Sequence, residues 1–182
     1  LYGASSHQSF ESNFGSTESL HAPSESGGFW HRWFPKDRDF VSEGFLSDKS
    51  VCDLRNNVNS LMSRYRKPML FKNLAAGQRL QVLQEAFPES KFVFIRRDPF
   101  FTIQSLLLAR AKQSMPESRW WSVRPRNFKE LSQLPYLEKI VGQVYFHEKQ
   151  IVEDAKLIGG DRLFQIRFSC YAEQWNVRLG FL

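Results

Sequence analysis

The chain has 182 residues, enough for one domain with a full hydrophobic core. Its 25 Lys and Arg against 19 Asp and Glu give a formal net charge of +6, which suits nucleic acid, acidic membranes and phosphate-bearing small molecules alike. Two cysteines exclude a disulfide framework, and no apolar run reaches the roughly 20 residues that span a bilayer, so we expect a cytoplasmic protein without stable membrane insertion.

The first 40 residues carry two different compositions. Residues 1–28 are rich in Ser and Gly and are predicted to be mainly loop. The segment GFWHRWFPKDRDF, residues 28–40, then places five aromatic residues among basic ones. It is interpreted either as a hydrophobic plug docked on the core or as a lid or acceptor pocket.

Apolar residues recur at helical spacing from Asp48 to Tyr65, which predicts one amphipathic helix. PMLF, residues 68–71, reads as a short buried strand. Residues 77–87 form a second helical pattern, which Pro88 stops.

The second half of the chain continues the alternation of strands and helices. FVFI, residues 92–95, predicts a buried strand, and a helix follows it directly. A long helix is expected over residues 136–158, and RLFQIRF, residues 162–168, supplies another strand. The predicted class is α/β, as a single domain over residues 1–182 with PMLF and FVFI as parallel neighbours in one sheet.

Two arginines lie between the strand FVFI and the next helix. Asp98 is a good N-cap and Pro99 a good first helical residue, so Arg96 and Arg97 lie at the carboxyl end of a strand, where parallel sheets collect ligands. A helix N-terminus attracts anions, and an arginine fork matches two phosphate oxygens. Ser105 follows Asp98 by seven residues, about two turns, and returns to the same side of the helix.

Lys72 strengthens this prediction of an anion site. It directly follows PMLF, so it would lie in the same crevice as Arg97 if the two strands are neighbours. Because Arg96 and Arg97 are adjacent on an extended strand, they should point to opposite faces, and Arg97 is the one assigned to the anion.

These residues carry a resemblance to a known family. KPMLFKN followed by a helix and by FPESKFVFIRRDPFFTIQSLL resembles the sulfotransferase family, and SESGGFWHRWF, SRWWSVRP and PYLEKIVGQVYFHEKQI resemble its bacterial-type branch. The similarity runs from about Phe10 to Phe168. It implies a P-loop-like three-layer sandwich with a central parallel sheet, and sulfuryl transfer from 3′-phosphoadenosine 5′-phosphosulfate (PAPS) to a hydroxyl or amine acceptor such as a small molecule, a glycan or a lipid.

The resemblance also implies roles for individual residues. Arg97 and Ser105 match the positions that bind the 3′-phosphate of the donor, and Lys72 matches the lysine at the cofactor crevice. Phe168 matches the aromatic position of a later strand, where it stacks on the adenine or is plain core. Glu25 is the preferred general base, with His31 and His21 as the other candidates, and no metal is expected.

The chain departs from the family pattern in three ways, one of which is that the Gly-rich closing motif of the cytosolic branch is absent from the sequence. The segment of type P-R-S-G-T-T that holds the 5′-phosphosulfate is absent from the sequence and would precede Leu1; the start without Met favours a missing segment, and the chain as given would then be inactive. Leu74 stands where the cytosolic branch has a catalytic histidine.

Two other functions stay open on the sequence alone. One is a nucleotide-dependent kinase on a similar sheet, although no G-x-x-x-x-G-K-[ST] motif occurs in the chain. The other is a basic nucleic-acid-binding module that uses SRWWSVRPR, residues 118–126, although nucleic acid is not the partner we expect.

Overall fold

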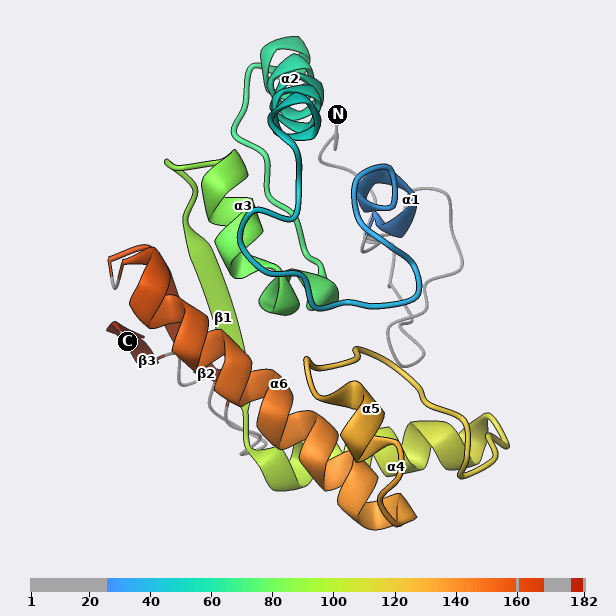
Figure 1. Ribbon diagram of the computed structural model, residues 1–182. Coiled ribbons are helices and arrows are strands. Elements are labelled where there is room, and N and C mark those ends of the chain that lie inside the picture. Colours follow the sequence, from blue (N-terminus) through green and yellow to red (C-terminus); the bar gives the residue numbers. More distant parts are fainter. Residues whose placement is uncertain (1–25, 160, 169–177, 182) are drawn as a thin grey trace, which may run out of the picture.

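The structure is a computed structural model that describes residues 26–159, 161–168 and 178–181. A group of helices precedes β1, a second group of helices follows it, and β2 and β3 come last in the order shown in Figure 1. Their bounds are α1 Gly27–Trp30, α2 Asp48–Tyr65, the 3-10 helix η1 Leu74–Gln78, α3 Leu80–Ala86, β1 Phe92–Arg97, α4 Pro99–Lys112, α5 Phe128–Leu131, α6 Tyr136–Ile158, β2 Leu163–Phe168 and β3 Arg178–Phe181. The α/β class predicted from the sequence is confirmed.

The described strands form one sheet in the order β1-β2-β3. β1 and β2 are parallel, with a register that runs from Phe92 opposite Leu163 to Arg97 opposite Phe168. β3 is antiparallel to β2. Because β1 and β2 are parallel, their carboxyl ends meet at one edge of the sheet, which is where Arg97 and Phe168 lie.

The prediction that residues 68–71 form a strand beside FVFI is wrong. This segment has no strand geometry, and β1 pairs with β2 instead. Phe71 is held by the aromatic residues of α1: its ring stacks on Phe29 at 5.7 Å between centroids and meets Trp30 edge-on at 5.0 Å.

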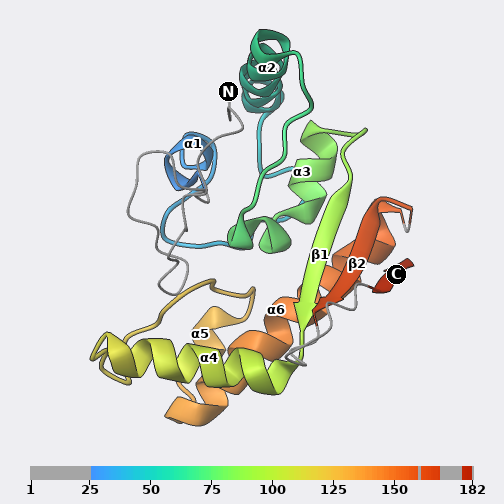
Figure 2. The same cartoon turned by 180° about the vertical axis from the view of Figure 1, so that it is seen from behind.

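The long helices form where the apolar periodicity predicted them. In α2 the Ser47 hydroxyl accepts a hydrogen bond from the backbone N–H of Ser50 at 3.3 Å, and the helix buries Leu54 and Val58. α6 buries a stripe along its length that includes Ile140, Val144, Ile151, Ala155 and Ile158. In Figure 1 α6 crosses in front of the sheet, and in Figure 2 the strands lie in front of it, so α6 covers one face.

The two faces of β1 have different surroundings. Phe92 and Phe94 pack toward a core cluster of Leu80, Ile151, Ala155, Ile158 and Leu163. On the opposite face Val93 is 52% exposed and Ile95 67% exposed. We call this second side the open face; it comprises Val93, Ile95 and Arg97 of β1 and, by register, Phe164, Ile166 and Phe168 of β2.

The aromatic segment after residue 28 is part of the core. Trp30 and Phe34 are 6% and 3% exposed, and they cluster with Leu54, Val58 and Val82. Their burial supports the interpretation of this segment as a hydrophobic plug rather than a lid.

Candidate functional site

The turn between β1 and α4 has the geometry that the sequence predicted. Asp98 is the N-cap of α4, and one of its carboxylate oxygens accepts a hydrogen bond from the backbone N–H of Phe100 at 2.8 Å. Pro99 is the first helical residue, and the hydroxyl of Thr102 donates to the carbonyl of Asp98 at 3.1 Å. Since the Asp98 carboxylate already takes one N–H group, an anion here depends more on a side-chain cation than on the helix terminus.

The two arginines at the end of β1 lie on opposite faces, as their alternation predicted. Arg96 is on the covered face, where its Nε donates to a carboxylate oxygen of Glu148 on α6 at 2.8 Å. Arg97 is partly buried on the open face, at the carboxyl end of the strand. Only Arg97 therefore remains directed toward the side of the sheet on which a ligand is expected.

Ser105 lies on the side of α4 that faces Arg97. The guanidinium carbon of Arg97 is 5.9 Å from the ring centroid of Phe101, within the range of a cation–π contact. Phe101 and Ser105 are four residues apart on α4, so their side chains are neighbours on one face of the helix. Ser105 is partly buried at this position.

Phe168 is the third predicted site residue that the fold brings to this place. It ends β2 as the register partner of Arg97, and its side chain is 37% exposed. Partners in adjacent parallel strands present their side chains on the same face, so an exposed ring and a guanidinium stand side by side at the carboxyl edge of the sheet. We call Arg97, Phe101, Ser105 and Phe168 the β1–α4 site.

The predicted catalytic residues are placed differently. Lys72 is exposed and directly precedes Asn73, whose side chain caps η1 by accepting from the backbone N–H of Ala76 at 3.0 Å. It does not end a strand, so the expectation of two neighbouring strand ends with a cation each is not met. Glu25 and His21 lie outside the described residues, and His31 is exposed at the end of α1.

A second group of polar residues lies between η1, α6 and the loop after α1. Arg79 is 3% exposed; its Nε donates to the carbonyl of Asp39 at 3.0 Å, and its guanidinium is 3.7 Å from the Asp39 carboxylate. The backbone N–H of Arg124 donates to the other carboxylate oxygen of Asp39 at 2.8 Å. Asp39 therefore joins two distant segments of the chain.

The same region holds a histidine. The side-chain nitrogen of Gln78 is 3.1 Å from Nδ1 of His147 on α6, and Gln78 itself is fully buried. Burial lowers the pKa of His147 to about 4, against an opposing, smaller effect of the Asp39 charge. Burial also lowers the pKa of Arg79, with the Asp39 charge again opposing it.

Burial shifts the pKa of Asp154 on α6 in the opposite direction, upward. It is 2% exposed, and one of its carboxylate oxygens accepts hydrogen bonds from the side chains of Gln81 and Gln150. Burial raises its pKa, and these two hydrogen bonds oppose the rise. The amides satisfy the carboxyl group and tie α3 to α6.

Sequence reasoning did not find the group around Asp39, Arg79 and His147. The three residues are far apart in the sequence and follow no motif, and Arg79 is followed directly by an apolar helix. A cation at such a position usually remains exposed, so only the fold shows that it is buried with a partner.

In residues 26–159, 161–168 and 178–181 no group of three or more His, Cys, Asp or Glu side chains could hold a metal ion. Within the same residues, none of the helices combines the length and the hydropathy needed to cross a bilayer.

Comparison of the chain with protein-family models, with curated proteins and with solved structures finds no match.

Proposed function

We propose that the chain belongs to a sulfotransferase that uses PAPS as sulfuryl donor, and that the β1–α4 site binds the 3′-phosphoadenosine end of this donor. Arg97 would pair with the 3′-phosphate, Ser105 would donate its hydroxyl to the same group, and Phe168 would stack on the adenine. The P-loop-like three-layer sandwich, with a further layer over the open face, is part of the same proposal.

The adjacency of Arg97 and Phe168 is the observation that carries the proposal. The family resemblance brings both residues to one ligand if Phe168 stacks on the adenine rather than being plain core. They are 71 positions apart in the sequence, and the register of β1 and β2 makes them direct partners. A nucleotide needs a flat apolar surface for its base and a fork of donors for its phosphate, and this pair offers both on one face.

We assign the residues of the β1–α4 site to the 3′-phosphoadenosine end of the donor only. Arg97 and Ser105 suit a 3′-phosphate, and we assign none of the described residues to the 5′-phosphosulfate. When bound, the donor supplies the sulfuryl group itself. Glu25 is proposed to accept the proton of the acceptor hydroxyl or amine.

Titration of two nucleotides tests the phosphate contact. Replacing Arg97 by alanine should weaken the binding of adenosine 3′,5′-bisphosphate about 10- to 150-fold, since a charge-assisted contact contributes about 1.5–3 kcal/mol. Adenosine 5′-phosphate lacks the 3′-phosphate, so its affinity should scarcely change. Isothermal titration calorimetry with wild type and Arg97→Ala measures both.

Arg96→Ala is the matched control for this titration. Arg96 is the adjacent arginine on the covered face and is paired with Glu148, so its removal changes the net charge equally without touching the site. Equal losses for the two nucleotides, or equal losses in the two variants, would show a general basic attraction and contradict the proposal.

The role of Glu25 has a separate test in turnover. Glu25→Gln keeps the size of the side chain and removes its basic oxygen, so sulfuryl transfer should slow by ~10²-fold or more while donor affinity stays near wild type. The measurement is a single-turnover assay in the complete protein. Near-normal turnover in Glu25→Gln rejects this residue as the base and leaves the donor site unaffected.

A further inference from the structure

Exposed apolar and basic side chains follow one another over residues 62–70, where α2 ends. Leu70 is 91% exposed, Tyr65 55% and Met62 38%, and the cations between them are exposed as well. The α2-end patch consists of Met62, Arg64, Tyr65, Arg66, Lys67 and Leu70. Leu70 has the highest exposed fraction of the large exposed apolar residues among the described positions, so this patch needs an explanation beyond the scatter of single apolar residues on a surface.

The backbone holds this patch in place. Arg66 ends α2 in the left-handed conformation, with φ of 50°, which turns the chain back toward the core. Phe71 then anchors the returning segment through its ring contacts with Phe29 and Trp30. Phe71 is partly buried by these contacts, whereas the preceding Leu70 is 91% exposed.

The charge around the patch has one sign. Between Asp53 and Glu85 the sequence contains no acidic residue. Among the residues described by the structure, Arg64, Arg66 and Lys67 take part in no ion pair, whereas Arg96 and Lys149 each have a carboxylate partner within 4 Å. The patch therefore presents three cations whose charge is not offset by a paired carboxylate.

We propose that the α2-end patch docks the protein on a bilayer surface that contains anionic lipids. Cations of a peripheral protein are attracted by the negative surface potential, and neighbouring apolar side chains enter the boundary between headgroups and acyl chains. The exposed aliphatic side chains decide between a membrane and a nucleic acid. Single-stranded nucleic acids bind through aromatic stacking, and the patch has one aromatic ring, Tyr65, beside Leu70 and Met62.

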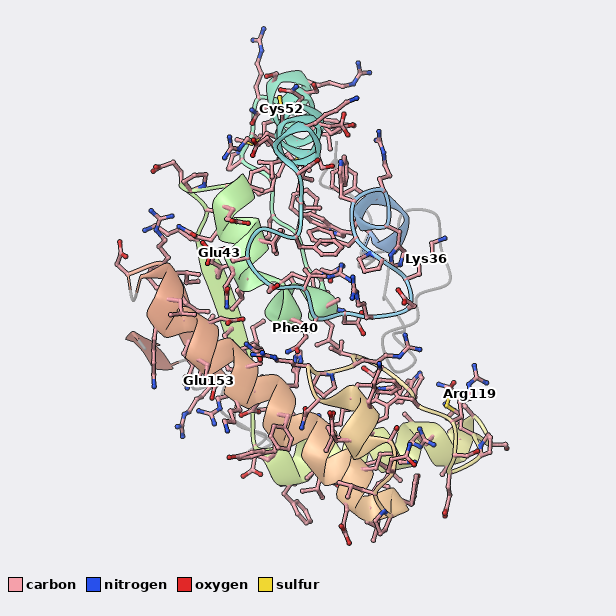
Figure 3. The ribbon with its side chains drawn as sticks, viewed as in Figure 1. Lys36, Phe40, Glu43, Cys52, Arg119 and Glu153 are labelled. Carbon is pink, nitrogen blue, oxygen red and sulfur yellow. The ribbon has the colours of Figure 1, made fainter. Side chains whose placement is uncertain are left out.

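This surface is separate from the β1–α4 site and does not depend on the proposed function. In Figures 1 and 2 α2 lies at one end of the structure and α4 at the other. Figure 3 shows the same separation at side-chain level, with Cys52 of α2 at one end and Arg119, after α4, toward the other. A protein docked through α2 keeps the carboxyl edge of the sheet away from the lipid.

Vesicle binding tests the proposal with the full chain. Wild type should bind vesicles of equal parts phosphatidylglycerol and phosphatidylcholine and should not bind phosphatidylcholine alone. Each cation near an anionic surface raises the partition coefficient about five-fold, so the triple variant Arg64→Gln/Arg66→Gln/Lys67→Gln should lose about 100-fold. Co-sedimentation with the vesicles measures both.

A matched triple variant controls for net charge. Arg119, Lys129 and Lys156 are also exposed and lie outside the patch, so their replacement by glutamine removes the same three charges. That variant should stay within about three-fold of wild type, because exposed charges far from the contact are screened. Equal losses in the two triple variants would show non-specific attraction and overturn the proposal.

Single leucine substitutions test the apolar contribution to vesicle binding. Leu70→Ser should weaken binding to the anionic vesicles about 10-fold, whereas Leu157→Ser, at a leucine 71% exposed on α6, should have no effect. Circular dichroism establishes that each variant is folded. Two results would contradict a lipid surface as the partner. One is that wild type binds a single-stranded oligonucleotide but neither type of vesicle. The other is that Leu70→Ser binds the anionic vesicles as well as wild type does.

Discussion

Asp39→Ala is expected to lower the free energy of unfolding by about 3–5 kcal/mol, the cost of leaving a buried cation without its carboxylate. Arg79 is 3% exposed, and the Asp39 carboxylate is its ion-pair partner. The substitution also removes the acceptor of the Arg124 backbone N–H, so one of the hydrogen bonds between the loop after α1 and the segment before α5 is lost as well. Urea unfolding at neutral pH measures the change.

Asp37→Ala is the control for this prediction. Asp37 is exposed two residues earlier on the same loop, and only its backbone carbonyl is bonded, to the guanidinium of Arg124 at 2.7 Å. Its substitution should change the free energy of unfolding by less than about 0.5 kcal/mol. Combining Arg79→Met with Asp39→Ala should recover much of the lost stability, since no buried charge then remains. Equal effects of Asp37→Ala and Asp39→Ala on the free energy of unfolding would show that the Asp39–Arg79 ion pair does not stabilise the fold as expected.

Acid should destabilise the protein through His147 before it titrates most carboxylates. The pKa of His147 is lowered from 6.5 to about 4, so below pH 6.5 the unfolded chain binds a proton that the folded protein excludes. The stability that comes from a neutral His147 is therefore complete above pH 6.5 and is lost as the pH falls toward 4. The full loss is roughly 3 kcal/mol, since a tenfold change in proton affinity corresponds to about 1.4 kcal/mol.

The variant His147→Gln isolates this contribution. Glutamine does not titrate and can still exchange a hydrogen bond with Gln78, so the difference in free energy of unfolding between pH 7 and pH 4.5 should shrink by about 2–3 kcal/mol. Asp154 acts in the opposite sense, because its raised pKa favours the folded state at low pH, and it is present in both proteins. Urea unfolding at a series of pH values gives the comparison, and an unchanged pH profile in the variant would contradict a His147 that is neutral in the folded protein.

The long helices were predictable from the sequence because their information is local, whereas the short α1, η1 and α5 were not predicted. The apolar spacing from Asp48 to Tyr65 and from Tyr136 to Ile158 gave the bounds of α2 and α6. The turn after β1 was also predictable, since an Asp-Pro pair after an apolar run indicates a capped helix start. Local signals of this kind fix both the conformation and the direction of side chains.

The pairing of strands was harder to predict, because it is decided by segments far apart in the chain. The sequence identified β1 and β2 as strands but made residues 68–71 the neighbour of β1. Four apolar residues in a row predict a buried strand, but the structure leaves Leu70 exposed and holds Phe71 through ring contacts, which the local sequence does not encode. The same limit applies to Lys72, whose assignment to the crevice depended on that pairing.

β1 is the outermost described strand on its side of the sheet, and its backbone N–H and C=O groups there are a template for a strand of another molecule. The exposed Val93 and Ile95 belong to the open face beside that edge. In an antiparallel pairing of two copies centred on Phe94, the Lys91 of each chain stands opposite the Arg97 of the other, and like charges directly opposite oppose such pairing. In that register Arg97 disfavours self-association, and this effect weakens as salt rises.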